Sequence, residues 1–241
     1  LQLNAACHVL LDPPHFGGGN TTYEALALGT PVVTLPSGML RGRLAYKMYE
    51  TMGVRDCTRY KLQWSDNADM LAYLALYHIA DPELPRSADW KKQSSLGRWP
   101  TEIRQHVTGR SNGVYRQIFH AAAKAAPGKK DSIDSDNMYF LQQSIPADLD
   151  GKFNELYNTD HIPLMLQTPG VDSCTRYKLE YSESGGVPDY LAVYAIDTVD
   201  RPRTPEWKKQ TGLGAWPTQM RPNFTARRNG VYHRLGVFTP K

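Results

Sequence analysis

Cysteine is scarce in this chain. Among 241 residues only Cys7, Cys57 and Cys174 occur, which is an odd number. Cys57 and Cys174 stand at equivalent places in a repeat described below, so we interpret them as small buried apolar residues and not as a disulfide pair. This usage excludes a disulfide-stabilised secreted domain and favours a reducing compartment. We expect a cytoplasmic protein.

Long hydrophobic runs and a dominant charge sign are also missing. No apolar run approaches the roughly 18 residues of a membrane-spanning helix. Lys and Arg number 28 against 24 Asp and Glu, a net charge of +4. The densest basic run, Arg221, Arg227 and Arg228 beside Phe224, has no stripe of interleaved aromatic residues, so we interpret it as a solvated helix end. We expect neither a membrane nor a nucleic-acid partner.

Two site patterns are absent as well. The sequence has no cysteine–histidine spacing of the kind that binds a metal ion, and no Ser-His-Asp set can be argued. We therefore expect no metal centre, no resident cofactor and no hydrolase of the serine-triad kind.

The chain does contain an internal sequence repeat with two copies. Cys57 to Leu62 recurs as Cys174 to Leu179, and Asn112 to Tyr115 recurs as Asn229 to Tyr232, at a constant separation of 117 residues. The pairs Trp90/Trp207 and Trp99/Trp216 keep the same separation, and core packing is the expected role of these tryptophans. The match ends upstream at Gly53. Because no insertion separates the copies, we expect them to fold alike and to pair with one another.

The second copy gives a topology. Strand patterns at 138–144, 174–181, 190–196 and 230–238 alternate with an amphipathic helix from Pro146, which Pro163 interrupts, and a helical segment at 205–210. The order β-α-β-β-α-β gives a four-stranded antiparallel sheet with both helices on one face. We predict an α+β protein whose two ferredoxin-like units pair as an intrachain α+β barrel.

The boundaries follow from the repeat. Residues 1–56 form a foreign α/β piece, 57–119 a partial first copy, 120–137 a linker with a short helix at 121–126, and 138–241 the complete second copy. An intrachain pseudo-dimer is expected, and a further homo-oligomer is left open.

A family resemblance supports this fold. The segment Phe153-Asn154-Glu155-Leu156-Tyr157-Asn158-Thr159-Asp160-His161-Ile162-Pro163-Leu164, with Pro169-Gly170 after it, resembles the EthD-like branch of the dimeric α+β barrel proteins. The resemblance covers 138–238 well and 57–119 in part. It implies a barrel fold, while the superfamily holds enzymes, small-ligand binders and members of unassigned function.

His161 is the best single candidate for chemistry. A histidine titrates near about 6.5 unperturbed, so it exchanges protons readily at neutral pH. Tyr157 lies one helical turn before it, while the adjacent Asp160 is a poor orienter because neighbouring side chains diverge. We predict His161 and Tyr157 as catalytic residues for proton transfer on a small organic ligand.

The predicted ligand contacts come from the strands of the second copy. Tyr177, Tyr190 and Tyr194 alternate along them and are candidates to line a cleft for a planar ligand, with Arg176 as a further contact. In the first copy Leu44 stands where His161 does, so only one copy would be active. The alternative, a structural histidine that caps the helix, stays open.

The first 56 residues differ from both copies. A short apolar run at Cys7–Asp12, the loop Gly17-Gly18-Gly19, a helix start at Asn20 and a second apolar run at Val32–Leu35 alternate as in α/β proteins. A glycine loop before a helix N-terminus suits anion binding.

These residues resemble a second family. His15-Phe16-Gly17-Gly18-Gly19-Asn20-Thr21-Thr22-Tyr23-Glu24-Ala25-Leu26-Ala27-Leu28-Gly29-Thr30-Pro31 is similar to the C-terminal domain of SPINDLY-type O-linked N-acetylglucosaminyltransferases. The resemblance implies Thr21, Thr22 and Glu24 as contacts of a UDP-sugar. It covers about a fifth of the chain and lacks a second nucleotide-binding-type domain, so transferase activity is not expected.

Two hypotheses follow from this join. One is that Val32–Leu35 and a helix at 41–52 complete the first copy, with Val32–Leu35 pairing with the sheet that contains Cys57–Leu62. The other is an artificial fusion. For the whole chain three functions stay open: a small-molecule binder or enzyme that uses His161, a nucleotide-sugar-binding remnant, and a non-catalytic scaffold.

Overall fold

The structure is a computed structural model that describes residues 10–12, 32–34, 54–95, 99–125 and 132–238. The chain divides into two compact units. One comprises 1–57, 77–110 and 237–241, and the other 58–76 and 111–236. Among the described helices none is long and apolar enough to cross a membrane.

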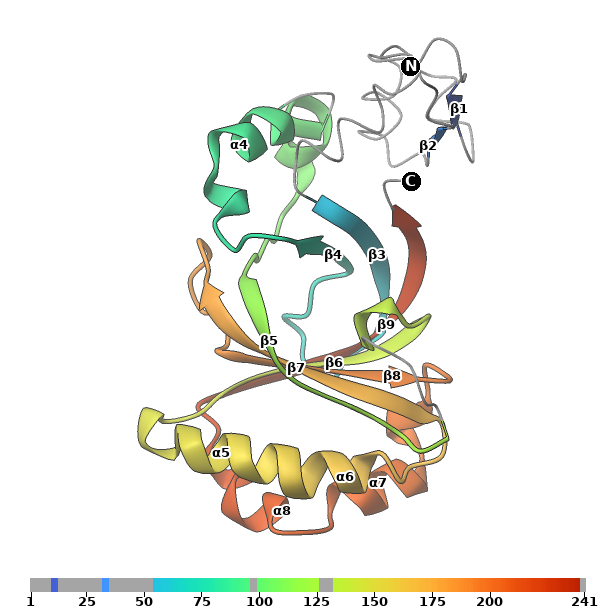
Figure 1. Ribbon diagram of the computed structural model, residues 1–241, viewed down its shortest axis with the longest axis vertical. Coiled ribbons are helices and arrows are strands. Elements are labelled where there is room, and N and C mark those ends of the chain that lie inside the picture. The colour runs from blue at the N-terminus through green and yellow to red at the C-terminus, as the bar shows by residue number, and fades with distance from the viewer. Residues whose placement is uncertain (1–9, 13–31, 35–53, 96–98, 126–131, 239–241) are drawn as a thin grey trace. The chain divides into compact units, whose positions relative to one another are not determined.

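The second copy folds with the predicted topology. Its strands are β6 (Asn137–Ser144), β7 (Val171–Tyr181), β8 (Tyr190–Ile196) and β9 (Ala226–Phe238). They lie in the order β9-β6-β8-β7, and the pairings of β6 with β9, of β6 with β8 and of β7 with β8 are antiparallel. Helices α5 (Asp150–Leu156), α6 (Ile162–Met165), α7 (Pro205–Thr211) and α8 (Trp216–Gln219) lie together on one face of this sheet (Figure 1). The split β-α-β unit is confirmed.

The helix that carries the candidate histidine runs further than the sequence predicted. Between α5 and α6 the residues Tyr157–His161 form a π-helical turn, so Pro163 does not interrupt the helix as we had expected. Proline has no backbone N–H and cannot make the usual bond to the carbonyl four residues back. A wider turn before it accommodates that loss, and such turns are frequent at functional sites.

The first copy adds three strands to the same sheet. These are β3 (Val54–Trp64), β4 (Tyr73–Ile79) and β5 (Val114–Ala122), and the full order is β4-β3-β9-β6-β8-β7-β5. The last strand of each copy pairs with the second strand of the other: β5 with β7, and β9 with β3. This reciprocal exchange makes the tandem units an intrachain α+β barrel, as predicted.

The first copy lacks one strand among the described residues. In the second copy β6 lies between β9 and β8, so its counterpart in the first copy would lie between β5 and β4, which are the two ends of the seven-stranded order. The residues at that place in the repeat, 20–27, lie outside the described part of the chain. The described first copy also holds α4 (Ala88–Ser94).

The two short strands near the N-terminus correct one hypothesis. β1 (Leu10–Asp12) pairs in parallel with β2 (Val32–Thr34), with Leu10 opposite Val32. Parallel pairing agrees with the α/β character expected for this piece. The predicted pairing of Val32–Leu35 with the sheet of Cys57–Leu62 is wrong, because within the described residues that sheet holds neither β1 nor β2.

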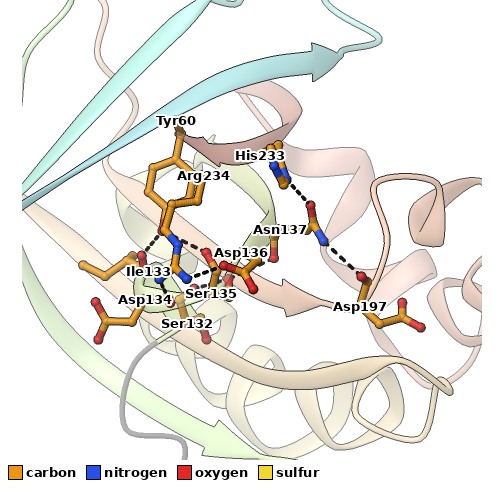
Figure 2. A network of polar contacts seen from close by, with 10 residues as sticks. All are labelled: Tyr60, Ser132, Ile133, Asp134, Ser135, Asp136, Asn137, Asp197, His233 and Arg234. Atoms are coloured by element: carbon orange, nitrogen blue, oxygen red, sulfur yellow. Dashed lines mark hydrogen bonds and ion pairs between the residues drawn. The ribbon is translucent and has the colours of Figure 1, made fainter. Parts of the chain in front are cut away.

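The linker is shorter than predicted. Strand β5 continues to Ala122, and a turn follows it where we had expected a helix at 121–126. After the gap in the described residues, a single 3-10 turn at Ser132–Asp134 leads into β6. Tyr60 of β3 donates hydrogen bonds to the carbonyl oxygens of Ile133 and of Ser135 (Figure 2). Through these bonds the first copy holds the segment that leads into β6, the first strand of the second copy.

Two hydrophobic clusters cover the two faces of the sheet. Alternate residues of β6 point to opposite faces, so Tyr139 and Leu141 join the cluster under the helices, while Met138 and Phe140 join the cluster inside the barrel. Tyr60 and, at its edge, Leu62, Met70 and Leu74 bring the first copy into the barrel cluster. Burial on both faces explains why β8 is a continuous apolar run.

Candidate functional site

A pocket of about 430 Å³ opens between the helices and the sheet of the second copy. Three alternate residues of β6 form its floor, and the residues of β8, of the helices and of the segment leading into β9 form its walls. Of the first copy's described residues, Trp64 and Asp66 line the pocket. The lining residues are Trp64, Asp66, Tyr139, Leu141, Gln143, His161, Met165, Tyr194, Pro202, Trp207, Lys208, Thr211, Trp216, Arg221, Phe224 and Arg227.

His161 lies in the wall of this pocket and is 6% exposed. Its ring stacks on Trp216 with centroids 4.9 Å apart and an interplanar angle of 17°, and it meets Tyr157 edge-on at 5.1 Å. Its Nδ1 atom is buried and has no hydrogen-bond partner within the described part of the chain. A buried polar atom left unpaired costs about 1–3 kcal/mol, so this nitrogen requires an explanation.

The surroundings keep the His161 imidazole neutral. Burial, followed by the positive charges of Arg221 and Arg176, lowers its pKa from 6.5 to about 3. The sequence had predicted a group that titrates near neutral pH, and the structure differs because burial penalises the imidazolium form. A neutral imidazole has one nitrogen that donates and one that accepts a hydrogen bond.

Three uncharged groups lie near His161: the hydroxyls of Tyr157 and Tyr194 and the thiol of Cys174. Tyr194 donates a hydrogen bond to the Tyr157 hydroxyl at 3.2 Å, and both phenols are fully buried. Burial raises the pKa of Tyr157 and of Tyr194 well above 10, and it raises the pKa of the Cys174 thiol to about 12. These groups stay protonated at neutral pH, and the Tyr157 hydroxyl accepts the hydrogen bond of Tyr194.

Arg176 is a buried cation that pairs with no carboxylate of the described segments. It is 1% exposed and donates hydrogen bonds to Asn158 Oδ1 at 2.6 Å and to Asn154 Oδ1 at 2.8 Å. Its guanidinium lies 4.2 Å from the centre of the Tyr157 ring. Two amide oxygens and a ring face therefore compensate the charge. Arg176 does not line the pocket, and its contacts indicate that it positions the helix carrying Tyr157.

Asp160, which the sequence indicated to be a poor orienter of the adjacent His161, instead contacts the segment that begins α8. Its carboxylate accepts hydrogen bonds from the backbone N–H groups of Ala215 at 2.8 Å and Trp216 at 3.2 Å. These are groups at the N-terminal end of α8, which lack partners inside the helix. Although Asp160 does not hold the His161 ring itself, it fixes the tryptophan on which that ring stacks.

The predicted site residues divide between the two faces of the sheet. His161, Tyr157, Arg176, Tyr190 and Tyr194 lie on the helix-covered face, where Tyr194 and His161 line the pocket. Tyr190 instead donates a hydrogen bond to the Asp150 carboxylate and packs on Phe153 at 4.7 Å. Tyr177 belongs to the cluster inside the barrel. Thr21, Thr22 and Glu24 lie outside the described residues, so the UDP-sugar contacts stay a prediction.

Sequence reasoning missed much of the pocket wall. Trp207 and Trp216 were assigned to the core, where they are indeed 5% and 2% exposed, yet both also line the pocket. The basic run Arg221 and Arg227 with Phe224 was interpreted as a solvated helix end. Its aromatic neighbour was the available signal, because positive charge beside an aromatic ring suits a ligand as well as solvent.

Comparisons with known proteins bear on the fold. No family model matches the sequence, and a search of curated proteins gives no significant match. Among solved structures, an anthrone oxidase-like protein aligns over 86% of this chain and 90% of its own, with a TM-score of 0.56 and 11% identity. A candidate monooxygenase from Fusobacterium nucleatum aligns over 80% and 86%, with a TM-score of 0.45 and 11% identity.

The first of these likenesses establishes the fold. The chain shares the architecture of the anthrone oxidase-like protein, and at 11% identity the similarity extends to nothing finer. The EthD-like assignment stays a prediction. The comparisons lend no support to the glycosyltransferase likeness of residues 1–56.

Proposed function

We propose that the protein binds a planar aromatic small molecule in the pocket between helices and sheet, and that His161 exchanges a proton with it. The observation that carries the proposal is the buried Nδ1 of His161, unpaired among the described residues, in the wall of an aromatic-lined pocket. A polar atom of a ligand would supply the missing hydrogen bond. The pocket volume lies within the range of about 300–1,000 Å³ common for small-molecule sites.

The aromatic walls support the choice of ligand. Trp64, Tyr139, Tyr194, Trp207, Trp216 and Phe224 all line the pocket. Such rings bind other rings through stacked or edge-to-face contacts that add about 0.5–1.5 kcal/mol each beyond area burial. A flat polycyclic ligand makes several of these contacts at once, whereas a sugar or a flexible chain makes few.

Proton transfer follows from the neutral state of His161. In the tautomer that carries its proton on Nε2, Nδ1 accepts a proton from an acidic C–H group of the ligand. The electron pair of the broken C–H bond is delocalised over the ring and its carbonyl oxygen. Since the pKa of His161 is low, the imidazolium forms only beside this anion and then returns its proton to the ligand or to solvent.

Anthrone is a suitable probe for the test. It is a planar tricyclic ketone with a CH₂ group between two rings, and one fold neighbour is named anthrone oxidase-like. We would measure binding by quenching of tryptophan fluorescence, and exchange of the CH₂ protons in D₂O by NMR under argon. We expect saturable binding and protein-dependent exchange.

Two variants separate the proposed role from a structural one. His161→Phe keeps a planar aromatic ring at this place and should abolish exchange, while His233→Gln, at an exposed histidine that does not line the pocket, should leave it unchanged. If anthrone does not bind, or if His161→Phe exchanges its protons as fast as the unmodified protein, the proposal is wrong and His161 is a packing residue.

A further inference from the structure

The charged residues that line the pocket are unbalanced. Lys208, Arg221 and Arg227 contribute three positive charges, and Asp66 contributes one negative charge. Asp66 accepts a hydrogen bond from Asn229 Nδ2 at 3.2 Å. No ion pair within the described part of the chain engages any of the four. Among the described residues the pocket therefore carries a positive excess that no ion pair offsets.

Two of the three cations are held in place. Arg221 donates from Nη2 to the carbonyl oxygen of Thr211 at 2.7 Å, and Arg227 donates from Nη2 to the Tyr139 hydroxyl at 3.4 Å. An arginine has five N–H donors in a fixed planar fork, so one bond fixes its direction and leaves the others free. Free, oriented guanidinium donors match the two oxygens of a carboxylate.

The positive charge extends toward the candidate catalytic group. After burial, the charge of Arg221 is the largest contributor to the depressed pKa of His161. Bringing an anion to Arg221 would offset that effect as well as fill the vacant donors. Charge in a cleft with low-dielectric walls is felt more strongly than on an open surface.

We propose that the ligand of this pocket is an aromatic carboxylate, whose ring lies among the tryptophans while its carboxylate binds Arg221 and Lys208. This inference rests on the proposed function and specifies the substrate class of the same site. Arg221 and Lys208 are then specificity residues. They select acidic aromatic compounds over neutral ones of the same shape.

The test compares two ligands that differ in one group. Anthraquinone-2-carboxylate and 2-(hydroxymethyl)anthraquinone share the tricyclic ring, and only the first is charged. We expect the carboxylate to bind more tightly by about fivefold for each cation engaged, since an exposed ion pair contributes up to about 1 kcal/mol. This preference should shrink between about 0.01 M and about 0.5 M salt, because salt screens exposed charges.

The repeat supplies matched controls. Arg221→Gln and Lys208→Gln should each lower the affinity for the carboxylate by about fivefold and leave the affinity for the alcohol unchanged. Arg104 and Lys91 occupy the same places in the first copy and do not line the pocket, so Arg104→Gln and Lys91→Gln should have no effect. All four side chains are exposed, and circular dichroism would verify that each variant is folded.

The outcomes separate the two proposals. If both ligands bind equally and neither Arg221→Gln nor Lys208→Gln changes the ratio, the carboxylate inference is overturned while the proposed function stands. If neither ligand nor anthrone binds, the proposed function falls and the inference falls with it.

Discussion

At the scale of single residues, His161 combines a polar ring with an apolar setting. It stacks on Trp216, contacts Tyr157 and is nearly inaccessible to solvent. Its one-turn separation from Tyr157 was readable from the sequence, and the contact between the two rings was expected. The partners that set its charge state were not readable, because Arg221 and Arg176 approach from a 3-10 turn after α8 and from β7, which only the fold brings to His161.

The depressed pKa of His161 makes stability depend on pH with a definite sign. Below about pH 6.5, His161 takes up a proton in the unfolded chain. In the folded chain it takes up a proton only near pH 3. The unfolded state therefore binds more protons in this window. The contribution of His161 to the free energy of unfolding is therefore complete above pH 6.5. It is lost as the pH falls below that value, at about 1.4 kcal/mol per pH unit.

We expect His161→Phe to remove this dependence. The substitution keeps the ring contact with Trp216 and eliminates a buried unpaired nitrogen, so at pH 7 the free energy of unfolding should stay the same or rise by about 1 kcal/mol. Urea unfolding at pH 7, 6 and 5 measures both effects. His233→Gln should keep the slope of the unmodified protein, and an unchanged slope in His161→Phe would show that other groups cause the acid sensitivity.

At the scale of elements, the second copy was largely predictable. Short runs rich in apolar residues, alternating only in β7, located β6, β7 and β8 to within three residues of their observed ends. The prediction that Pro163 interrupts the helix was wrong. The sequence shows that proline lacks a backbone N–H, but it does not show the packing that stabilises a π-helical turn before it. The contacts of Asp160 with α8 were also invisible, since they join segments that only the fold brings together.

We expect Asp160→Ala to destabilise α8 and to loosen the pocket. The substitution removes the one oxygen, Oδ2, that accepts from both the Ala215 and the Trp216 N–H groups, and loss of such a cap costs about 1 kcal/mol. Because Trp216 supports His161, ligand affinity should fall as well. Chemical unfolding measures the first effect, and near-ultraviolet circular dichroism and anthrone titration measure the second.

Two further variants test this assignment. Asp160→Asn retains an oxygen acceptor and should recover most of the lost stability. Asp148→Ala removes an exposed carboxylate in the 3-10 turn before α5 and should change the unfolding free energy by less than about 0.5 kcal/mol. Equal losses in Asp160→Asn and Asp160→Ala would mean that the charge, and not the hydrogen bonds, is what matters.

At the scale of the whole molecule, the exact spacing of the duplication predicted the barrel. Equal spacing implied equal folds, and a half-covered sheet requires a partner for its other face. What the repeat did not reveal is how the first copy begins, since the proposed role of Val32–Leu35 was wrong. A pattern of apolar residues identifies a strand. It does not say which strand it pairs with when more than one sheet edge is available.

The exchange of strands between the copies has a consequence for the second copy alone. In the chain, β7 pairs with β5 and β9 pairs with β3, and Met138, Phe140, Leu191 and Tyr232 pack against the first copy inside the barrel. Residues 132–238 in isolation would expose both strand edges and this apolar face. Unpaired edges and large apolar patches drive association.

We therefore expect a fragment of residues 132–238 to form a homodimer. The β9 strand of one fragment would pair with β7 of the other, because β3 and β7 are the same strand of the repeat and β3 already pairs with β9 in the chain. Sedimentation velocity over a range of concentrations would give twice the fragment mass, and circular dichroism would report native secondary structure. A folded, soluble monomer would contradict this expectation, because it would mean that the sheet tolerates an uncovered face. The barrel would then owe its closure to the covalent link between the copies and not to complementarity of their edges.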